Sequence, residues 1–398
     1  MRLTRERWQR AELKYRKQGY GHSAMTPTSV HHVLLAIDSL TGRGAERVVV
    51  NLGEALLQLG HHVSIVIYED IVELEVDSRI CIHRLNPAPR CRPRFLSRLT
   101  DNQNVCLFKA LLKRIEAEQG RVNLILSALP RMDRILSRIK DSRIHHVIHN
   151  PLSWQNGIRN NGWRKKISRI WHAKRIYDGR QIIAVSVGVG DDLVEFVKVR
   201  PAKIRTINNP FHFDRLAALA VKPFTLPAGV LAKDYLLHIG AFTLKQKRQD
   251  VLIEAFARSG LQSKLVLLGK GKDEEKIRAL IKSHGLADRV ILAGFQENPF
   301  PWIRHARLLV LSSDYEGFGN VLLEAMVLGT PAVSTDCPTG PREIFSGSMR
   351  DCLVPIGDVQ GLAAKMSYFH KQPPHIDTES LRRFEASTVA NEYLKLIP

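Results

Sequence analysis

The chain has 398 residues, more than one hydrophobic core usually serves, so we expect two domains. Its hydrophobic fraction of 44% and charged fraction of 25% are typical of a folded globular protein. The net charge of +20 is uneven, because residues 1–208 carry 36 Lys and Arg against 19 Asp and Glu, whereas residues 209–398 carry 23 against 20. A basic half beside a nearly neutral half indicates that one domain faces an anionic partner: nucleic acid, a membrane surface or a diphosphate ligand.

The chain begins with a basic extension, residues 1–28, that has no apolar segment of the kind found in a secretory signal. We find no apolar run of about eighteen residues, so no transmembrane helix is expected. The five cysteines are scattered and odd in number, with no CxxC pair. That usage favours a reducing compartment and argues against a disulfide framework or a zinc site.

Buried-looking strands alternate with amphipathic helices along both halves of the chain. Strands are predicted at residues 30–37, 61–68, 122–128, 143–149, 181–186, 234–242, 263–269, 289–295, 306–313 and 330–335. Helices are predicted at residues 45–60, 107–118, 250–259, 273–285, 320–329 and 381–397. Short apolar strands that alternate with helices indicate parallel sheets covered on both faces, so we expect an α/β protein with two doubly wound, Rossmann-like domains.

The boundary between the domains is predicted near residue 208. An Asn-Asn-Pro turn lies there, and two further prolines come later in the same segment. The expected division is an N-terminal domain at 29–208, a C-terminal domain at 209–380 and a final helix at 381–398 that packs back toward the first domain. Ligands bind at the carboxyl ends of parallel strands, so two facing sheets would form one cleft between the domains.

The most informative segment is SSDYEGFGNVLLEAMVLGTPAVSTDCPTGPREI, from Ser312 to Ile344. It places Glu316 in the loop after a predicted strand and Glu324 on the helix that follows. The amides around the start of that helix suit phosphate or sugar oxygens, and glycines let a ligand approach the backbone. The alternative is ordinary structure, in which Asp314 or Glu316 caps the helix and Glu324 faces solvent.

This segment resembles the E-x7-E signature of retaining nucleotide-sugar glycosyltransferases with the two-domain GT-B architecture, and DCPTGPREI resembles the bacterial branch that builds lipopolysaccharide, lipid-linked glycans and capsules. Three further stretches are similar to the family in the same order: TGRGAER at 41–47, FTLKQKRQDVLIEAF at 242–256 and LLGKGKDEEKIRALIKSHGLADRVILAGF at 267–295. The resemblance extends from Val30 onward and is densest between Leu236 and Ile344.

The resemblance implies that the first domain binds the acceptor and the second binds the nucleotide-sugar donor. Glu316 would contact the donor sugar near the reacting centre, Glu324 would hold the ribose hydroxyls, and Lys247 would neutralise the departing diphosphate. The implied donor site comprises Gly42, Gly44, Gly240, Lys247, Glu316, Gly317, Phe318, Gly319, Asn320, Val321 and Glu324. No metal or other cofactor is implied, and the sequence holds no Asp-x-Asp metal motif. Lys247 could instead be an exposed lysine, and Gly42 and Gly44 plain turn residues.

One departure from the family pattern lies at Ala241, where the family often has an arginine in Gly-Arg-Leu or Gly-Arg-Phe. The loop that leads to Lys247 is also one residue longer than usual. A second cation for the diphosphate is therefore missing from its usual place. Arg248 or Lys245 could replace it.

His149 ends a predicted strand at a cleft position, and in the family a residue of this region lies near the acceptor and the donor sugar. We take it as a catalytic candidate with Glu316, although a histidine at a strand end is more often structural.

A basic amphipathic segment covers residues 162–179, with Trp163, Ile167, Ile170 and Trp171 on one helical stripe. Tryptophans beside lysines and arginines suit an anionic membrane surface. The predicted membrane or acceptor contact comprises Trp163, Arg164, Lys165, Lys166, Arg169 and Trp171. The alternative is a helix whose apolar stripe packs on the sheet.

Together these features predict a retaining, metal-independent glycosyltransferase that moves a hexose or N-acetylhexosamine from a nucleotide sugar, with UDP as the expected nucleotide, to a lipid-anchored glycan. It would act peripherally on the cytoplasmic face of a bacterial inner membrane in cell-surface polysaccharide synthesis. The alternatives are a nucleotide-sugar epimerase of the same shape, or a non-catalytic basic protein that binds membrane or nucleic acid. No nucleic-acid motif is recognisable, so nucleic acid is not the expected partner.

Overall fold

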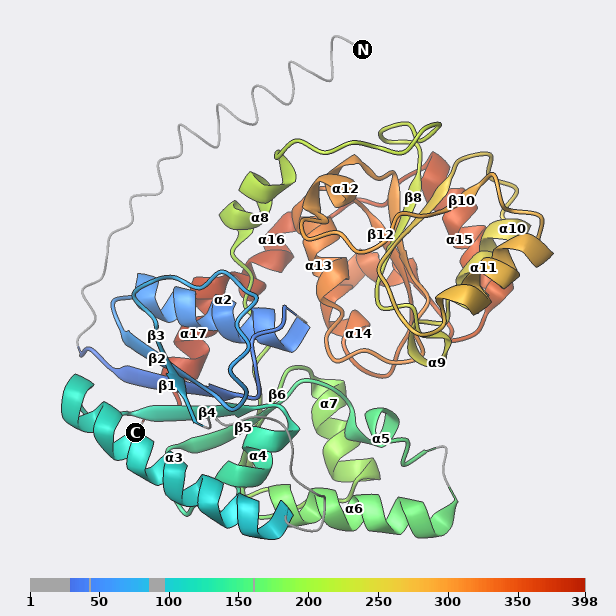
Figure 1. Cartoon of the computed structure of the whole chain (residues 1–398). Coiled ribbons are helices and arrows are strands. Elements are labelled where there is room, and N and C mark those ends of the chain that lie inside the picture. The colour runs from blue at the N-terminus through green and yellow to red at the C-terminus, as the bar shows by residue number, and fades with distance from the viewer. Residues whose placement is uncertain (1–28, 43, 86–96, 160–161, 398) are drawn as a thin grey trace. The chain divides into compact units, whose positions relative to one another are not determined.

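The structure is a computed structural model that describes residues 29–42, 44–85, 97–159 and 162–397. The basic extension predicted at residues 1–28 lies outside the described residues. Helices and strands carry the labels of Figure 1.

The first sheet has seven parallel strands in the order β3-β2-β1-β4-β5-β6-β7. Its strands are β1 (His32–Ile37), β2 (His62–Ile67), β3 (Cys81–Arg84), β4 (Leu124–Ala128), β5 (Ile144–Ile148), β6 (Gln181–Ala184) and β7 (Lys203–Thr206). The central strands β1 and β4 are buried along their whole length. They are therefore almost purely apolar rather than alternating, which is the pattern of a parallel sheet covered on both faces.

Helices cover both faces of this sheet (Figure 1). They are α2 (Gly44–Gln58), α3 (Ser97–Gln119), α4 (Pro130–Leu136), α5 (Leu152–Gln155), α6 (Trp163–Tyr177) and α7 (Val187–Asp191), which continues as a π-helical turn, η2 (Asp192–Phe196). Val33, Leu35 and Ile37 of β1 join the core under α2, whereas Leu34 and Ala36 join a second core under α3 and α4. Alternate residues of one strand thus fill two separate cores.

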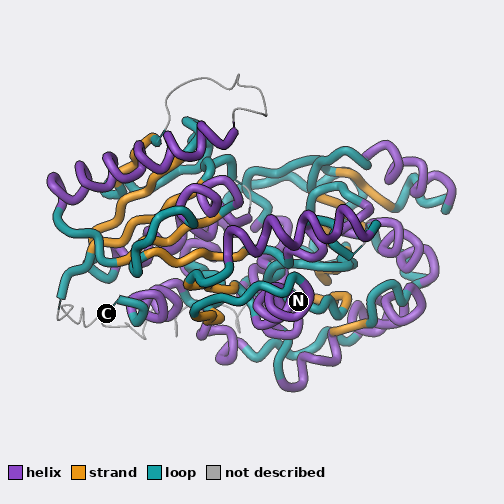
Figure 2. Tube along the Cα trace, turned by 90° about the horizontal axis from the view of Figure 1, so that it is seen from below, coloured by secondary structure: helices purple, strands orange, loops and turns teal. Residues whose placement is uncertain are grey.

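The second sheet has six parallel strands in the order β10-β9-β8-β11-β12-β13. Its strands are β8 (Leu236–Ile239), β9 (Leu265–Leu268), β10 (Val290–Leu292), β11 (Leu308–Leu311), β12 (Ala332–Thr335) and β13 (Leu353–Val354). The helices of this half are α8 (Phe213–Ala220), α9 (Leu244–Lys247), α10 (Gln249–Arg258), α11 (Glu274–Ser283), α12 (Phe300–His305), α13 (Asn320–Val327), α14 (Pro341–Ile344), the 3-10 turn η3 (Gly347–Cys352) and α15 (Val359–Lys371). Figure 2 shows the strands enclosed between helices.

The prediction of two parallel α/β sheets is confirmed. The sequence prediction lacked β3, β7 and β13. The first two are four-residue strands at the outer edges of the first sheet, and their residues are exposed or half-buried, so they lack an apolar run. The third has only two residues. Edge strands of this kind leave a weak sequence signal.

The helix predicted at residues 381–397 is wrong in its bounds. The chain forms α16 (Thr378–Leu381), a 3-10 turn η4 (Arg382–Phe384) and then α17 (Ala386–Leu394), which packs against α2. The interruption has a cause, because Phe211 takes part in a short bridge there: its amide donates to Phe384 O and its carbonyl accepts from Ala386 N. The domain boundaries drawn from the sequence stay predictions.

No helix among the described residues is both long and apolar enough to cross a membrane.

Candidate active site

The carboxyl end of β11 leads into the loop that carries Glu316. Gly319, with φ of 91°, ends this loop in the left-handed region, where glycine is favoured, and α13 begins at Asn320. The chain folds this way because Leu308–Leu311 is an apolar, fully buried strand and the glycines that follow permit a sharp turn. The predicted strand, loop and helix are confirmed at this position.

Glu316 is only 7% exposed and is held by two hydrogen-bond donors. Ser313 Oγ donates to Glu316 Oε1 at 2.5 Å, and Lys247 Nζ lies 2.6 Å from the same oxygen. The cation and the hydroxyl at one oxygen offset part of the cost of burying this carboxylate. The second oxygen accepts no hydrogen bond from the described side chains, so it is available to a ligand.

Lys247 reaches Glu316 across the end of β8. A Cβ at position 240 would lie 3.3 Å from Lys247 Cδ and Cε, so Gly240 leaves the space that the lysine side chain crosses. The backbone of this segment is fixed as well, because Ser312 Oγ donates to Lys247 O at 2.7 Å. The structure therefore brings Gly240, Lys247 and Glu316 together.

Arg248, one of the two residues considered in place of the arginine missing at Ala241, is already paired with carboxylates. Its guanidinium donates to Asp250 at 2.9 Å and to Asp314 at 3.0 Å, so both carboxylates already engage it. Ala241 and Lys245 are exposed. The other residue considered in place of the missing arginine is Lys245. No carboxylate among the described residues pairs with its ammonium group.

Glu324, in the middle of α13, is half-buried and receives no hydrogen bond from any described residue. Burial raises the pKa of Glu324 to about 7, and the charge of Arg47 only partly offsets this. A carboxyl group that is partly removed from water and receives no hydrogen bond is costly to ionise. Such a group is expected where a ligand supplies the missing donors.

The loop after β1 lies beside the start of α13. Gly42 has φ of 83°, and Arg47 Nε donates to its carbonyl at 3.1 Å. Gly44 is the first residue of α2, and a Cβ there would lie 3.8 Å from Asn320 Nδ2. Asn320 Oδ1 in turn accepts from Asn209 Nδ2 at 2.8 Å. The N-termini of α2 and α13 therefore meet, and both favour negative charge.

His149, just beyond β5, lies against the Glu316 loop. A Cβ at position 317 would lie 1.8 Å from His149 O, so only glycine fits at Gly317. Burial lowers the pKa of His149 to about 4, which keeps the ring neutral near pH 7. Its Nε2 is buried and has no hydrogen-bond partner among the described groups. A neutral imidazole nitrogen thus remains for a ligand.

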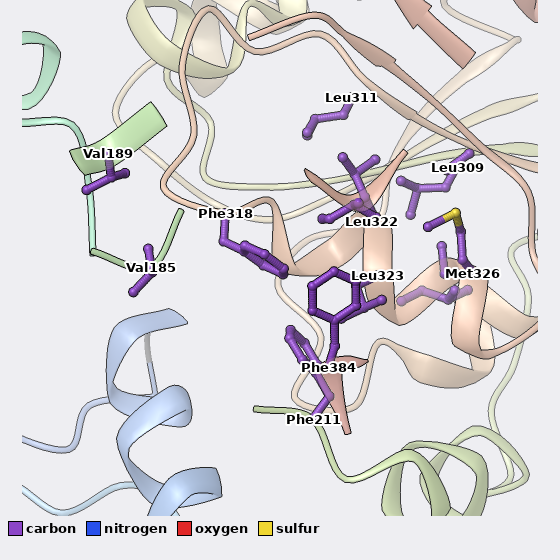
Figure 3. Packing of buried hydrophobic residues seen from close by; sticks show 14 of the residues in the cluster. Val185, Val189, Phe211, Leu309, Leu311, Phe318, Leu322, Leu323, Met326 and Phe384 are labelled. Atoms are coloured by element: carbon purple, nitrogen blue, oxygen red, sulfur yellow. The ribbon is translucent and has the colours of Figure 1, made fainter. Parts of the chain in front are cut away.

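The side chains of Phe318 and Val321 pack into the core. The buried Phe318 ring packs against Phe211 and Phe384, with ring centroids 6.2 and 5.3 Å away (Figure 3). Val321 packs against the same core. Their side chains hold the loop and α13 in place.

Two aromatic residues that the sequence analysis did not select connect the loops after β5 and β11. Trp154 stacks on Tyr315 with ring centroids 5.4 Å apart and an interplanar angle of 24°. The guanidinium of Arg159 lies over Trp154 at 4.9 Å. Tyr315 directly precedes Glu316, and that adjacency was the available signal. Trp154 has no sequence signal beyond its place after a strand.

The helix α6 exposes most of its predicted apolar stripe. Trp163, Ile167 and Trp171 are 68%, 57% and 59% exposed, whereas Ile170 packs against the core. The alternative in which the whole stripe packs on the sheet is wrong. The helix is anchored instead by Ala173, Ile176 and Tyr177 near its C-terminal end.

In the part of the chain that the structure describes, no three His, Cys, Asp or Glu side chains gather into a metal site.

Two family models match this chain. "Glycosyltransferase Family 4" matches residues 42–215 and "Glycosyl transferases group 1" matches residues 233–372. Between them they cover most of the sequence, including every donor-site candidate named above. The match favours the transferase over the epimerase and the nucleic-acid alternatives.

Two curated relatives differ in how much of their length is matched. An uncharacterized glycosyltransferase, MJ1059 of Methanocaldococcus jannaschii, is 35% identical over 178 residues, which is 43% of this chain and 44% of that protein. The N-acetylgalactosamine-N,N'-diacetylbacillosaminyl-diphospho-undecaprenol 4-alpha-N-acetylgalactosaminyltransferase of Campylobacter jejuni is 25% identical over 332 residues, which is 80% of this chain and 85% of that protein. The match thus spans less than half of the first relative and most of the second.

A solved structure shares the fold across nearly the whole chain. Anabaena Alr3699/HepE, in complex with UDP and glucose, superposes with a TM-score of 0.63 at 18% identity, over 92% of this chain and 95% of that one. The two sheets therefore form the GT-B fold.

Proposed function

Because the chain belongs to glycosyltransferase family 4, the retaining enzymes of the GT-B fold, we propose that it moves a hexose or N-acetylhexosamine from a UDP-sugar to a lipid-anchored glycan. It acts at the cytoplasmic face of a bacterial inner membrane, in the synthesis of a cell-surface polysaccharide.

One observation carries this proposal: the N-termini of α2 and α13 meet beside the Lys247–Glu316 pair. Gly44 starts α2 in the first half and Asn320 starts α13 in the second. Backbone amides at two helix starts and one ammonium group form a site for a dianion. A sugar diphosphate at this point would touch both halves of the protein.

The same groups suit sugar transfer, because charge builds on the diphosphate as the bond from the sugar C1 to the phosphate oxygen breaks. Lys247 and the amides at Gly317–Asn320 would stabilise that charge. Lys247 is paired with Glu316, so donor binding would share the lysine between the carboxylate and the phosphate. The other oxygen of Glu316 would then accept a sugar hydroxyl.

His149 and Glu324 would hold opposite ends of the donor. The unpaired Nε2 of His149, whose backbone lies against the Glu316 loop, would bond a sugar hydroxyl. Glu324, which lacks a hydrogen-bond donor among the described residues, would accept from the ribose hydroxyls. UDP as the nucleotide is supported by the UDP bound in the Anabaena protein of the same fold.

The acceptor is proposed to be a lipid-linked glycan, supported by the undecaprenol-linked substrate named for the Campylobacter relative. The exposed stripe of α6 fits a membrane surface, since Trp163, Ile167 and Trp171 would enter the interface while Arg164, Lys165, Lys166 and Arg169 would meet anionic headgroups. The basic first half, charge +17 against +3 in residues 209–398, is the acceptor side in this proposal.

The direct test is a thermal-shift panel of UDP, GDP, ADP and CMP with their common sugar conjugates, followed by a donor-hydrolysis assay with each conjugate that binds. A ligand that binds the folded state raises the melting temperature by mass action. We expect UDP to shift it and one UDP-sugar to shift it further. No shift with any nucleotide would contradict the proposal.

A further inference from the structure

The segment Gly-Pro-Arg-Glu follows the E-x7-E stretch and was given no role above. It leads into the short helix α14, whose glutamate contacts the other half of the protein. Val187 N–H donates to Glu343 Oε1 at 2.6 Å, and Asn208 Nδ2 donates to Glu343 Oε2 at 2.9 Å. Val187 begins α7, directly after β6, and Asn208 follows β7. One carboxylate from the second half thus binds two segments of the first half.

The contact is partly removed from water, because Glu343 is half-buried whereas Val187 is exposed. Burial raises the pKa of Glu343, while hydrogen bonds from Asn208, Val187 and Gly188 oppose the rise. Asn208 is itself positioned, because its Nδ2 also donates to Val185 O at 3.0 Å. Hydrogen-bond donors from the first half therefore take the place of water at the Glu343 carboxylate.

Close backbone packing surrounds this contact. A Cβ at position 188 would lie 2.2 Å from Pro338 O, so Gly188 is required for the approach. Thr339, next to Pro338, donates its hydroxyl to Glu316 O. The strip from Pro338 to Glu343 therefore touches α7 on one side and the Glu316 loop on the other.

A second hydrogen bond ties the start of α7 to that loop directly. Ser186 Oγ donates to Gly317 O at 2.8 Å, and it also accepts from Val189 N at 3.2 Å. Gly317 is the residue that lies against His149. Val187 follows Ser186 in the chain, so the bonds to Glu343 and to Gly317 hold the same turn at the start of α7.

We propose that Glu343 is a positioning residue for transfer, whose carboxylate holds the two halves in the closed arrangement that places His149 against the Glu316 loop. The inference rests on the proposed function for its kinetic consequence. Its structural part, that Glu343 holds α7 and the Glu316 loop together, stands without any substrate.

The first experiment is hydrogen exchange on Glu343→Gln and, as a matched control, Arg342→Ala. Arg342 is the neighbouring residue on α14 and pairs with Asp336 at 2.5 Å within the second half. The Glu343→Gln variant keeps the shape but places an amide NH2 against donors. We expect faster exchange at Val187 and Gly188 and in residues 313–319, about tenfold or more. The control should exchange like the unchanged protein.

The second experiment compares transfer kinetics and nucleoside binding in the same proteins. We expect Glu343→Gln to lower kcat about tenfold or more while the Kd for uridine stays unchanged, because loss of closure affects the assembled site and not the nucleoside subsite. A general folding defect would weaken uridine binding too. Asn208→Ala, which removes the contact from the other side, should give the same pattern.

Equal exchange and equal kcat in Glu343→Gln and Arg342→Ala would overturn the inference. Failure of the proposed function looks different, since the unchanged protein would then neither bind UDP nor release sugar, while the exchange result could still be obtained.

Discussion

The two sheets build their shares of the site in different ways. The second sheet supplies a compact sequence block, in which Glu316 and Glu324 lie on one loop and the helix that follows it. Lys247 reaches Glu316 from the neighbouring strand end. The first sheet supplies single residues from separate loops: Gly44 after β1, His149 after β5 and Ser186 after β6. A continuous block leaves a motif in the sequence, whereas scattered single residues do not.

The difference also extends to charge. On the second sheet, cations close to the loop are paired with carboxylates, as in Lys247–Glu316 and Arg248–Asp314. On the first sheet, α6 holds exposed tryptophans among lysines and arginines. The paired cations of the second sheet suit the proposed binding of one diphosphate. The exposed cations of α6 suit the proposed contact with an extended anionic surface.

The largest effect is expected at Glu316, on the second sheet. Glu316→Gln keeps the shape but weakens the pair with Lys247 and the contact to the donor sugar, so kcat should fall about 10²- to 10³-fold. Single-turnover transfer and donor hydrolysis would both be measured, and both should fall together. Transfer at the rate of the unchanged protein would remove Glu316 from the reacting centre.

A smaller effect is expected at His149, on the first sheet. His149→Ala removes a neutral ring whose Nε2 is unpaired, and kcat should fall roughly 10- to 100-fold. Because the pKa of His149 is held near 4, its loss should leave the shape of the pH–rate profile between about pH 6 and 8 unchanged. A profile that lost a limb in this range would show that His149 titrates during the reaction.

The aromatic stack offers a way to separate the two sides. Trp154→Ala removes the contact with Tyr315, and because Trp154 belongs to the first half we expect the acceptor KM to rise about tenfold with donor hydrolysis nearly unchanged. Phe196→Ala is a useful control, since it removes a ring that contacts Arg159 at 3.6 Å and lies outside the stack on Tyr315. Equal loss of hydrolysis and transfer in Trp154→Ala would erase the distinction.

At Glu324 the expected effect is on affinity and stability. Glu324→Gln should weaken UDP binding about tenfold, because an amide accepts only one of the two ribose hydroxyl bonds. The pKa of Glu324 is raised from 4.5 to about 7 in the folded protein, so the folded state binds more protons in this range and stability falls as pH rises from about 4.5 to 7.

Glu324→Gln introduces an uncharged amide, so the variant does not lose stability in this way as the pH rises. The variant should therefore melt a few degrees higher than the unchanged protein above about pH 7 and at the same temperature below about pH 4.5. Melting curves on either side of this range, with and without UDP, check this. A variant that melts lower than the unchanged protein at the alkaline end would mean that Glu324 is satisfied within the protein.

The smallest effect is expected at α6. Replacing Trp163 and Trp171 together by alanine should lower binding to vesicles rich in anionic lipid about five- to tenfold and leave donor hydrolysis unchanged. Flotation of protein with vesicles at two salt concentrations measures it. Equal flotation with and without the tryptophans would leave the charged residues alone responsible.

Much of the fold could be predicted from the sequence because the central strands are short apolar runs, such as those of β1, β4, β9 and β11, and parallel sheets bury such strands on both faces. The donor-side candidates could be placed in one region for a related reason, since Glu316 and Glu324 belong to a single strand, loop and helix.

Contacts between distant segments could not be predicted. Nothing local to Glu343 indicates that its partners lie at Val187 and Asn208, and nothing near Trp154 indicates Tyr315. Arg248 shows the same limit, because its partner Asp314 becomes visible only when the ends of β8 and β11 are placed side by side, whereas its other partner, Asp250, is close in the sequence.

The central claim is that a nucleoside diphosphate is held between the N-termini of α2 and α13, one from each half. Its most direct test is calorimetric titration of UDP and of uridine into the unchanged protein and into Gly44→Val, which places a branched side chain toward Asn320. The account predicts that UDP binds more tightly than uridine and that the variant loses tenfold or more of UDP affinity, about 1.4 kcal/mol, with uridine affinity kept. Equal affinity for UDP and uridine in the unchanged protein, or unchanged UDP affinity in the variant, would contradict it.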